Sequence, residues 1–183
     1  RAEIDFALEN ASWAGTVVQG MEAGRIPVRV THNDTKINNI LFDQDTGKAV
    51  CVIDLDTVMP GSMLYDFGDA LRIGGSTAAE DEVELDKVWF DERAFEAFAK
   101  VYLSEMREAL TEDELALLPL SVKLMTYECG IRFLTDYLNG DTYFKIHREH
   151  HNLDRARNQF KLVADIAGKE GLLAKMVEAA LKG

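Results

Sequence analysis

Two short apolar runs rich in β-favouring residues lie near the middle of the chain and strongly limit its fold. They cover residues 40–42 and 49–53, and a polar segment containing Gly47 separates them. Because glycine adopts a positive φ without steric cost, this pattern predicts a β-hairpin with a loop at its tip. A third short β run, residues 28–30, precedes the hairpin.

Most of the remaining chain has helical spacing of its apolar residues. We expect a helix over residues 3–21 that ends at Gly20, Gly24 and Pro27, and another that begins near Met63. Further helices are expected after Asp91, over residues 112–137 behind a Thr111–Glu114 capping box, and over residues 153–181, as one or two helices broken around Gly168 and Gly171. The predicted fold class is mostly α with a small β-hairpin.

Polar loops flank the hairpin on both sides. Residues 32–39 form an H-x-D-x-x-x-x-N string, and Asp54 follows the second apolar run. Asn39 enters the hairpin where Asp54 leaves it, so both should lie at its open end, close to Asp34. Carboxylate and amide oxygens suit Mg²⁺ together with phosphates. An aspartate beside such a metal can deprotonate a hydroxyl during phosphoryl transfer.

The neighbours of Asp34 extend this interpretation. Lys36 could offset charge on a transferring phosphate, which makes it a candidate for nucleotide binding. His32 is grouped with it, although hydrogen bonds that hold the loop are favoured for His32 over proton transfer. The alternative is that acidic loop residues merely cap turns, but the joint spacing across a hairpin argues against it.

These motifs resemble those of the protein-kinase-like fold, whose catalytic loop and metal-binding Asp motif are similar to residues 32–39 and 53–55. The HND variant, followed by Tyr65-Asp66-Phe67-Gly68-Asp69-Ala70, is more similar to the aminoglycoside phosphotransferase and choline kinase superfamily. Residues 31–41, 52–72 and 131–157 together look most like the N-acetylhexosamine 1-kinase group. On this resemblance, residues 1–183 form the C-terminal catalytic and acceptor-binding lobe of that α+β fold.

The resemblance implies a role for each matching position. Asp34 would be the catalytic base, Asn39 and Asp54 the Mg²⁺ ligands, and Asp66 a structural acid that braces the catalytic loop. ATP and Mg²⁺ would be required, and the acceptor would be a small sugar bound by Arg132 and Tyr143. For Arg132 a structural ion pair is the alternative, and Tyr143 could belong to the core.

Other acceptors and other classes of function stay open. Choline, homoserine or an aminoglycoside would keep the fold, and a catalytically inactive kinase-like binding module would be a different class. Choline sites favour aromatic cages, whereas Trp13 and Trp89 lie outside the motif loops. Arg132 would repel a cationic acceptor, although the acidic total charge favours one.

The expected nucleotide-binding lobe has no counterpart in these residues, because no Gly-rich loop precedes a strand pair and the glycines are scattered. We therefore expect that the chain needs an N-terminal lobe and that, alone, it binds ATP·Mg weakly and turns over poorly.

Composition excludes several partners. With 20 basic and 32 acidic residues the net charge is −12, which disfavours nucleic-acid backbones. No apolar run is long enough for a membrane span and no signal peptide is recognisable, so a cytoplasmic location without membrane contact is expected.

Cys51 and Cys129 are predicted to be buried thiols, as in a reducing compartment. The acidic residues 80–82 are predicted to be solvated surface. The His147, His150 and His151 set is predicted to be a solvated helix start rather than a metal site.

Overall fold

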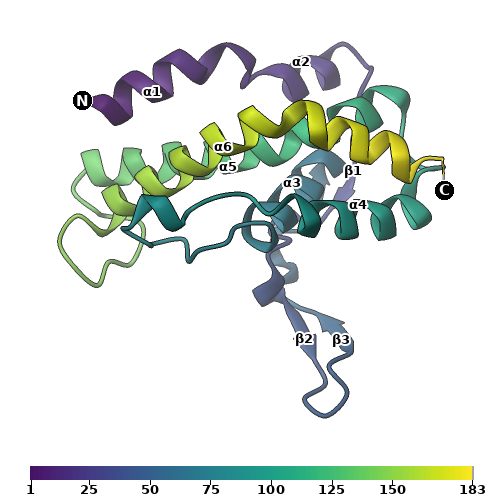
Figure 1. The fold of residues 1–183 in the computed structure, drawn as a ribbon, viewed down its shortest axis with the longest axis horizontal. Coiled ribbons are helices and arrows are strands. Elements are labelled where there is room, and N and C mark those ends of the chain that lie inside the picture. Colours follow the sequence, from purple (N-terminus) through teal and green to yellow (C-terminus); the bar gives the residue numbers. More distant parts are fainter. Residues whose placement is uncertain (183) are drawn as a thin grey trace.

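The computed structural model describes residues 1–182 and confirms a mostly helical chain with small two-stranded sheets. Figure 1 shows the long helices packed side by side, with one hairpin projecting away from them. The helices are α1 (Ala2–Asn10), α2 (Thr16–Glu22), α3 (Met63–Gly74), α4 (Glu92–Met106), α5 (Glu112–Leu138) and α6 (His151–Ala180). Within residues 1–182, no helix has both the length and the apolar character needed to cross a membrane.

The core lies where α5 packs against α6 on one side and α3 on the other. Gly68 of α3 makes this approach possible, because a Cβ there would collide with the backbone carbonyl of Ser121 in α5. The most deeply buried apolar side chains gather around this layer and include Phe67, Leu71, Leu118, Val122, Leu162 and Ile166. The polar loops are thus attached to a tightly packed helical base.

The N-terminal helix differs from the prediction. A 3-10 turn at Ala11–Trp13 separates α1 from α2, and Gly15 precedes α2 in a non-helical conformation. Gly20, expected to end the helix, lies inside α2, where the side chain of Ile26 covers it. The chain leaves α2 at Gly24, whose φ is +70°.

The C-terminal helix also differs, because α6 runs without a break through Gly168 and Gly171. Buried residues continue on both sides of the two glycines, from Ile166 to Leu173 and Val177. Packing against the rest of the molecule outweighs the weak helix preference of glycine here.

The two predicted helix caps, at Asp91 and at Thr111–Glu114, are confirmed, and Ser62 is a further cap that was not predicted. Ser62 and Asp91 accept hydrogen bonds from the backbone at the start of α3 and α4. Thr111 and Glu114 form the expected capping box of α5. Glu114, which is fully buried, also accepts two hydrogen bonds from Arg29, at 2.9 and 3.2 Å, and so ties the first strand to α5.

The predicted hairpin is confirmed as β2 (Ile40–Phe42) paired antiparallel with β3 (Ala49–Val52). Its side chains are largely exposed, including Cys51, so the prediction of two buried thiols was wrong for Cys51. Cys129 is buried as expected, and burial raises the pKa of its thiol to about 12.

A second small sheet was missed. Strand β1 (Arg29–Thr31) pairs with β4 (Met59–Gly61), which lies within the segment expected to be loop. Proline and glycine disfavour a strand on local grounds, so the pairing of Val30 with Pro60 was not predictable from the local pattern. This sheet holds together the two ends of the segment that carries the hairpin and its loops.

Candidate active site

Asp34 lies at the centre of a compact polar cluster. One of its carboxylate oxygens, Oδ2, accepts hydrogen bonds from Lys36 Nζ at 2.7 Å and from Asn39 Nδ2 at 2.9 Å. Within residues 1–182 the other oxygen, Oδ1, has no hydrogen-bond partner, and the side chain is 26% exposed. Asp34 therefore offers one carboxylate oxygen to solvent or to a ligand.

The electrostatic surroundings keep Asp34 ionised. Burial raises the pKa of its carboxyl, but the hydrogen bonds from Lys36 and Asn39 outweigh burial and hold the pKa below its ordinary value. The same pairing, against the opposing effect of burial, raises the pKa of Lys36, and the charges of Asp54 and Asp69 add to it. A permanently charged lysine thus faces several carboxylates.

Asp66, at the start of α3, holds the loop that carries Asp34. Its carboxylate accepts hydrogen bonds from the backbone N–H of His32 at 2.9 Å and of Asn33 at 2.7 Å. The Thr35 hydroxyl donates to the Asp66 carbonyl at 2.6 Å. Asn33 has a left-handed backbone (φ 64°), a conformation that asparagine tolerates better than most residues. The geometry supports a bracing role for Asp66.

Both ring nitrogens of His32 are engaged within the protein. Nε2 lies 3.1 Å from the carbonyl oxygen of Ile53, and Nδ1 accepts from the backbone N–H of Asp34 at 3.3 Å. His32 therefore links the Asp34 loop to the end of the hairpin, which supports the loop-holding role rather than contact with a nucleotide.

The base of the hairpin brings Asn39 and Asp54 to one edge. The backbone N–H of Ile53 donates to the Asn39 carbonyl at 2.9 Å, which places Asp54 one residue beyond that pairing. Asn39 is buried and directs its amide nitrogen to Asp34, and within residues 1–182 its Oδ1 accepts no hydrogen bond. Asp54 is exposed in a left-handed conformation with φ 63°.

This donor set fits a magnesium ion. One amide oxygen and one exposed carboxylate are hard ligands, and Mg²⁺ needs only one or two of them beside phosphates and waters. Within the described part of the chain, no group of three or more His, Cys, Asp or Glu side chains could hold a metal by itself. A magnesium ion held by Asn39 and Asp54 would complete its coordination with waters or with the phosphates of a nucleotide.

Arg132 and Tyr143 line a common hollow of about 300 Å³. It lies between α5 and the segment that follows it, and Ile131, Thr135, Asp136, Asn139, Thr142 and Phe144 complete it. The Arg132 guanidinium stands 5.4 Å from the Phe144 ring centroid and 3.7 Å from Glu128. Tyr143 is 75% exposed and is not part of the core.

The predictions about the acidic run and the histidine set were only partly right: His147 and His150 are exposed as expected, but Glu80, Asp81 and His151 differ. Glu80 and Asp81 are not free surface charges, because Glu80 bonds the buried Arg72 and Asp81 bonds His151. His151 is 1% exposed, so it is not part of a solvated helix start. No local signal marks these residues, because their partners lie far away in the sequence.

An aspartate on a braced loop, joined through a hairpin to an exposed second aspartate, is the arrangement expected of a kinase-type phosphotransferase. Comparison with protein families agrees: the model of the phosphotransferase enzyme family (APH) matches residues 5–111, more than half of the chain. The chain belongs to this family. The match includes Asp34, Asn39, Asp54 and Asp66 but ends before α5, so it does not include Arg132 or Tyr143.

Proposed function

We propose that the protein transfers a phosphoryl group from ATP to a hydroxyl of a small molecule, in the presence of Mg²⁺. The observation that carries this proposal is the difference between the surroundings of the two carboxylate oxygens of Asp34. Lys36 and Asn39 hold one oxygen, while the other is open beside the edge that carries Asp54. A base needs such a free oxygen, and its position must be fixed before the substrate arrives.

The proposed reaction moves one proton and one phosphoryl group. The acceptor hydroxyl donates its proton to Asp34 Oδ1 as its oxygen bonds to the γ-phosphorus, and the bond from that phosphorus to the bridging oxygen of ADP breaks. Lys36, already charged, lies where it could turn from Asp34 to the transferring group. Bound magnesium, held by Asn39 Oδ1 and Asp54, would neutralise phosphate charge.

For the acceptor we propose an N-acetylhexosamine sugar, phosphorylated at its anomeric hydroxyl, with the hollow at Arg132 and Tyr143 as its binding site. An exposed aromatic ring beside a guanidinium offers both stacking and hydrogen bonds to a neutral polyol. Choline is a weaker candidate, because Arg132 already occupies the face of Phe144 where a quaternary ammonium would sit. Aminoglycosides and homoserine remain alternative acceptors.

The nucleotide would lie between this chain and an N-terminal lobe. The projecting hairpin exposes Leu41, Phe42, Val50 and Val52, and we propose that it forms part of the nucleotide-side surface. Residues 1–183 would then act as the C-terminal catalytic lobe of a cytoplasmic enzyme.

Replacing Asp34 by Asn tests the base. The amide keeps the shape but cannot take a proton, so we expect kcat to fall about 10²–10⁴-fold. Turnover is measured with ATP·Mg and a panel of GlcNAc, GalNAc, glucose, choline, homoserine and kanamycin, using protein supplied with the N-terminal lobe. The control is Asp45→Asn at the exposed hairpin tip.

The outcomes separate the alternatives. Unchanged kcat in Asp34→Asn would refute the base assignment. Turnover of choline, homoserine or kanamycin but not of sugars would change the acceptor and keep the chemistry. No turnover of any acceptor, together with retained ligand binding, would favour a catalytically inactive binding module.

A further inference from the structure

A short turn at residues 79–82 is held against α6 by hydrogen bonds at its first and last residues. Asn158, which is fully buried, donates through Nδ2 to the carbonyl of Ala79 at 2.9 Å and to that of Glu82 at 3.3 Å. The Glu82 N–H also donates to the Ala79 carbonyl at 3.1 Å. The backbone of the turn is therefore fixed, and Glu80 and Asp81 extend from it toward two different parts of the molecule.

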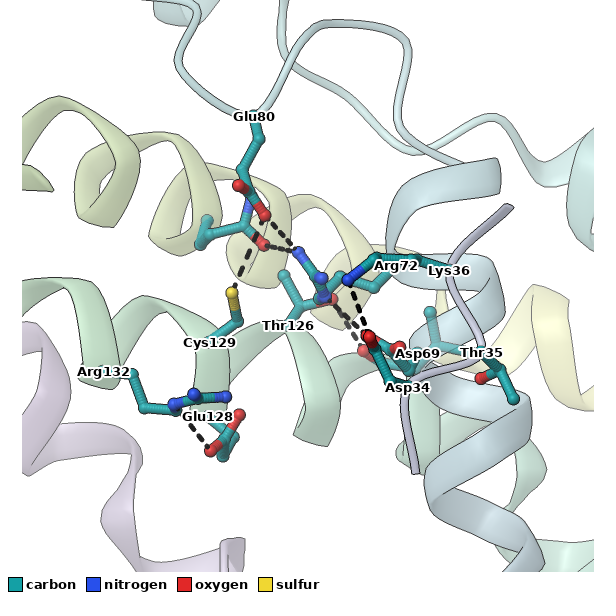
Figure 2. Close-up of polar contacts among 12 residues, drawn as sticks. Asp34, Thr35, Lys36, Asp69, Arg72, Glu80, Thr126, Glu128, Cys129 and Arg132 are labelled. Carbon is teal, nitrogen blue, oxygen red and sulfur yellow. Dashed lines mark hydrogen bonds and ion pairs between the residues drawn. The ribbon is translucent and has the colours of Figure 1, made fainter. Parts of the chain in front are cut away.

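Glu80 is connected to the Asp34 loop through side chains of α3. Its Oε1 accepts from Arg72 Nη1 at 2.6 Å, and Arg72 Nε donates to Asp69 Oδ1 at 3.0 Å. Figure 2 shows Arg72 lying between Glu80 and Asp69. Arg72 and Asp69 are buried on α3, the helix whose Asp66 holds the backbone of His32 and Asn33. Two hydrogen bonds thus join Glu80 to α3, and α3 in turn joins this pair to the base of the catalytic loop through Asp66.

Asp81 contacts the end of the segment between α5 and α6, the segment that also lines the hollow at Arg132 and Tyr143. Its Oδ2 lies 3.0 Å from Nε2 of the buried His151 and 3.2 Å from Arg148 Nη1, and its carbonyl accepts from Arg148 Nη2 at 2.9 Å. His151 Nδ1 accepts from the backbone N–H of His147 at 3.2 Å. These contacts hold the C-terminal end of the segment between α5 and α6.

Asp136 holds the other end of the same segment. Its carboxylate accepts from the backbone N–H groups of Thr142, Tyr143 and Phe144 at 2.8–2.9 Å. The segment that lines the hollow is therefore held at Asp136 by α5 and at His151 by Asp81, and α6 adds hydrogen bonds from Asn152 to Asp141 at 2.8 Å and from Arg155 to the Lys145 carbonyl at 3.3 Å. Of these attachments, the contacts of Asp81 are the ones made by the turn.

We infer that Glu80 and Asp81 are positioning residues for the proposed reaction, Glu80 for the catalytic loop and Asp81 for the acceptor hollow. This inference rests on the proposed function. Neither residue contacts reacting atoms, and each acts through a buried partner that is costly to leave unpaired. Both residues lie on one turn held by Asn158, so the two halves of the site share one support while each residue acts on its own half.

Three single variants test the two roles separately. Glu80→Gln should lower kcat about tenfold with the acceptor KM unchanged, because a neutral amide weakens the hold on Arg72. Asp81→Asn should instead raise the acceptor KM by about the same factor. The matched control is Glu82→Gln, because among residues 1–182 the Glu82 side chain bonds only the exposed backbone N–H of Glu84.

Hydrogen exchange provides a readout that does not need turnover. In Glu80→Gln the amides of His32 and Asn33 should exchange about tenfold faster, and in Asp81→Asn the amide of His147 should do so. Each variant should leave the amides at the other end at the wild-type rate. If Glu80→Gln does not fold, Arg72→Lys replaces it, because lysine keeps the charge but cannot bridge Asp69 and Glu80 in the same geometry.

The results distinguish this inference from the proposed function. Changes in kcat, KM and exchange that match those of Glu82→Gln would overturn the inference while wild-type turnover stands. Equal effects of both variants on both amide groups would also overturn it, because the turn would then act only on global stability. Absence of turnover with every acceptor in the wild type would refute the proposed function, and the exchange rates would still decide the positioning roles.

Discussion

Asp34 differs from an ordinary loop aspartate in how its two oxygens are used. Lys36 and Asn39 share Oδ2, while Oδ1 has no hydrogen-bond partner within residues 1–182 and is the atom proposed to accept the proton. The same contacts that orient the carboxylate also lower its pKa, so orientation and ionisation have one cause. Lys36 therefore affects the base even before a phosphate is bound.

Replacing Lys36 by Met should move the acid limb of the pH–rate profile to higher pH. In the wild type the pKa of Asp34 is lowered, so the ionised, active form persists as the pH falls through the ordinary aspartate range. Without the lysine, burial is opposed by Asn39 and more weakly by His32, the pKa of Asp34 rises, and activity is lost at a higher pH. The measurement is kcat/KM against pH.

The control is Lys36→Arg, which keeps the positive charge and should retain the wild-type acid limb. A lower kcat in Lys36→Met with an unshifted limb would mean that Lys36 serves only the phosphate and does not tune Asp34.

The α3 helix links the site to the core. Its first turn presents Asp66 to the catalytic loop, and Gly68 immediately afterwards lies against α5. The closeness of these two contacts means that a shift of α3 on α5 moves the Asp34 loop directly. The packing at Gly68 is therefore expected to matter for stability and for activity.

Gly68→Ala should destabilise the protein by about 1–3 kcal/mol, because the new methyl group collides with the Ser121 backbone. The matched variant is Gly168→Ala, in the exposed part of α6, where nothing lies within 4 Å of the added Cβ. Alanine is the better helix former, so that change should stabilise by up to about 1 kcal/mol. Urea denaturation measures both effects, and equal shifts of the same sign would contradict the packing argument.

The projecting hairpin is the most unusual feature of the whole molecule. Its apolar side chains are largely exposed, whereas apolar residues of a helical body are normally covered. An N-terminal nucleotide lobe packed against this hairpin would remove that surface from water and complete an ATP site. This expectation rests on the exposed apolar side chains of the hairpin and does not depend on the family relationship.

We expect the 183-residue protein alone to bind ATP·Mg weakly and to turn over slowly, and to gain both properties when the N-terminal lobe is added. Calorimetry measures nucleotide binding, and a coupled assay measures turnover. Val50→Ser on the hairpin should weaken association with the lobe but leave the unfolding midpoint of the chain alone unchanged, because Val50 is 64% exposed. Full activity without the lobe would contradict this prediction.

The local pattern of the sequence determined the hairpin, the helix caps and the joining of Asn39 to Asp54 at its base. These features depend on neighbouring residues: a turn glycine, a capping hydroxyl, and the fixed geometry by which a hairpin returns its ends to one edge. The same locality made the motif around Asp34 recognisable.

Tertiary structure alone decided the β1–β4 pairing, the unbroken α6, the ion pairs of Glu80 and Asp81, and the burial of His151. In each case a distant partner outweighs a local preference: Val30 for Pro60, the core for Gly168 and Gly171, and Arg72 for Glu80. A charged residue looks like solvated surface until the fold brings its counter-charge to it, because Coulomb attraction and desolvation depend on distance in space and not along the chain.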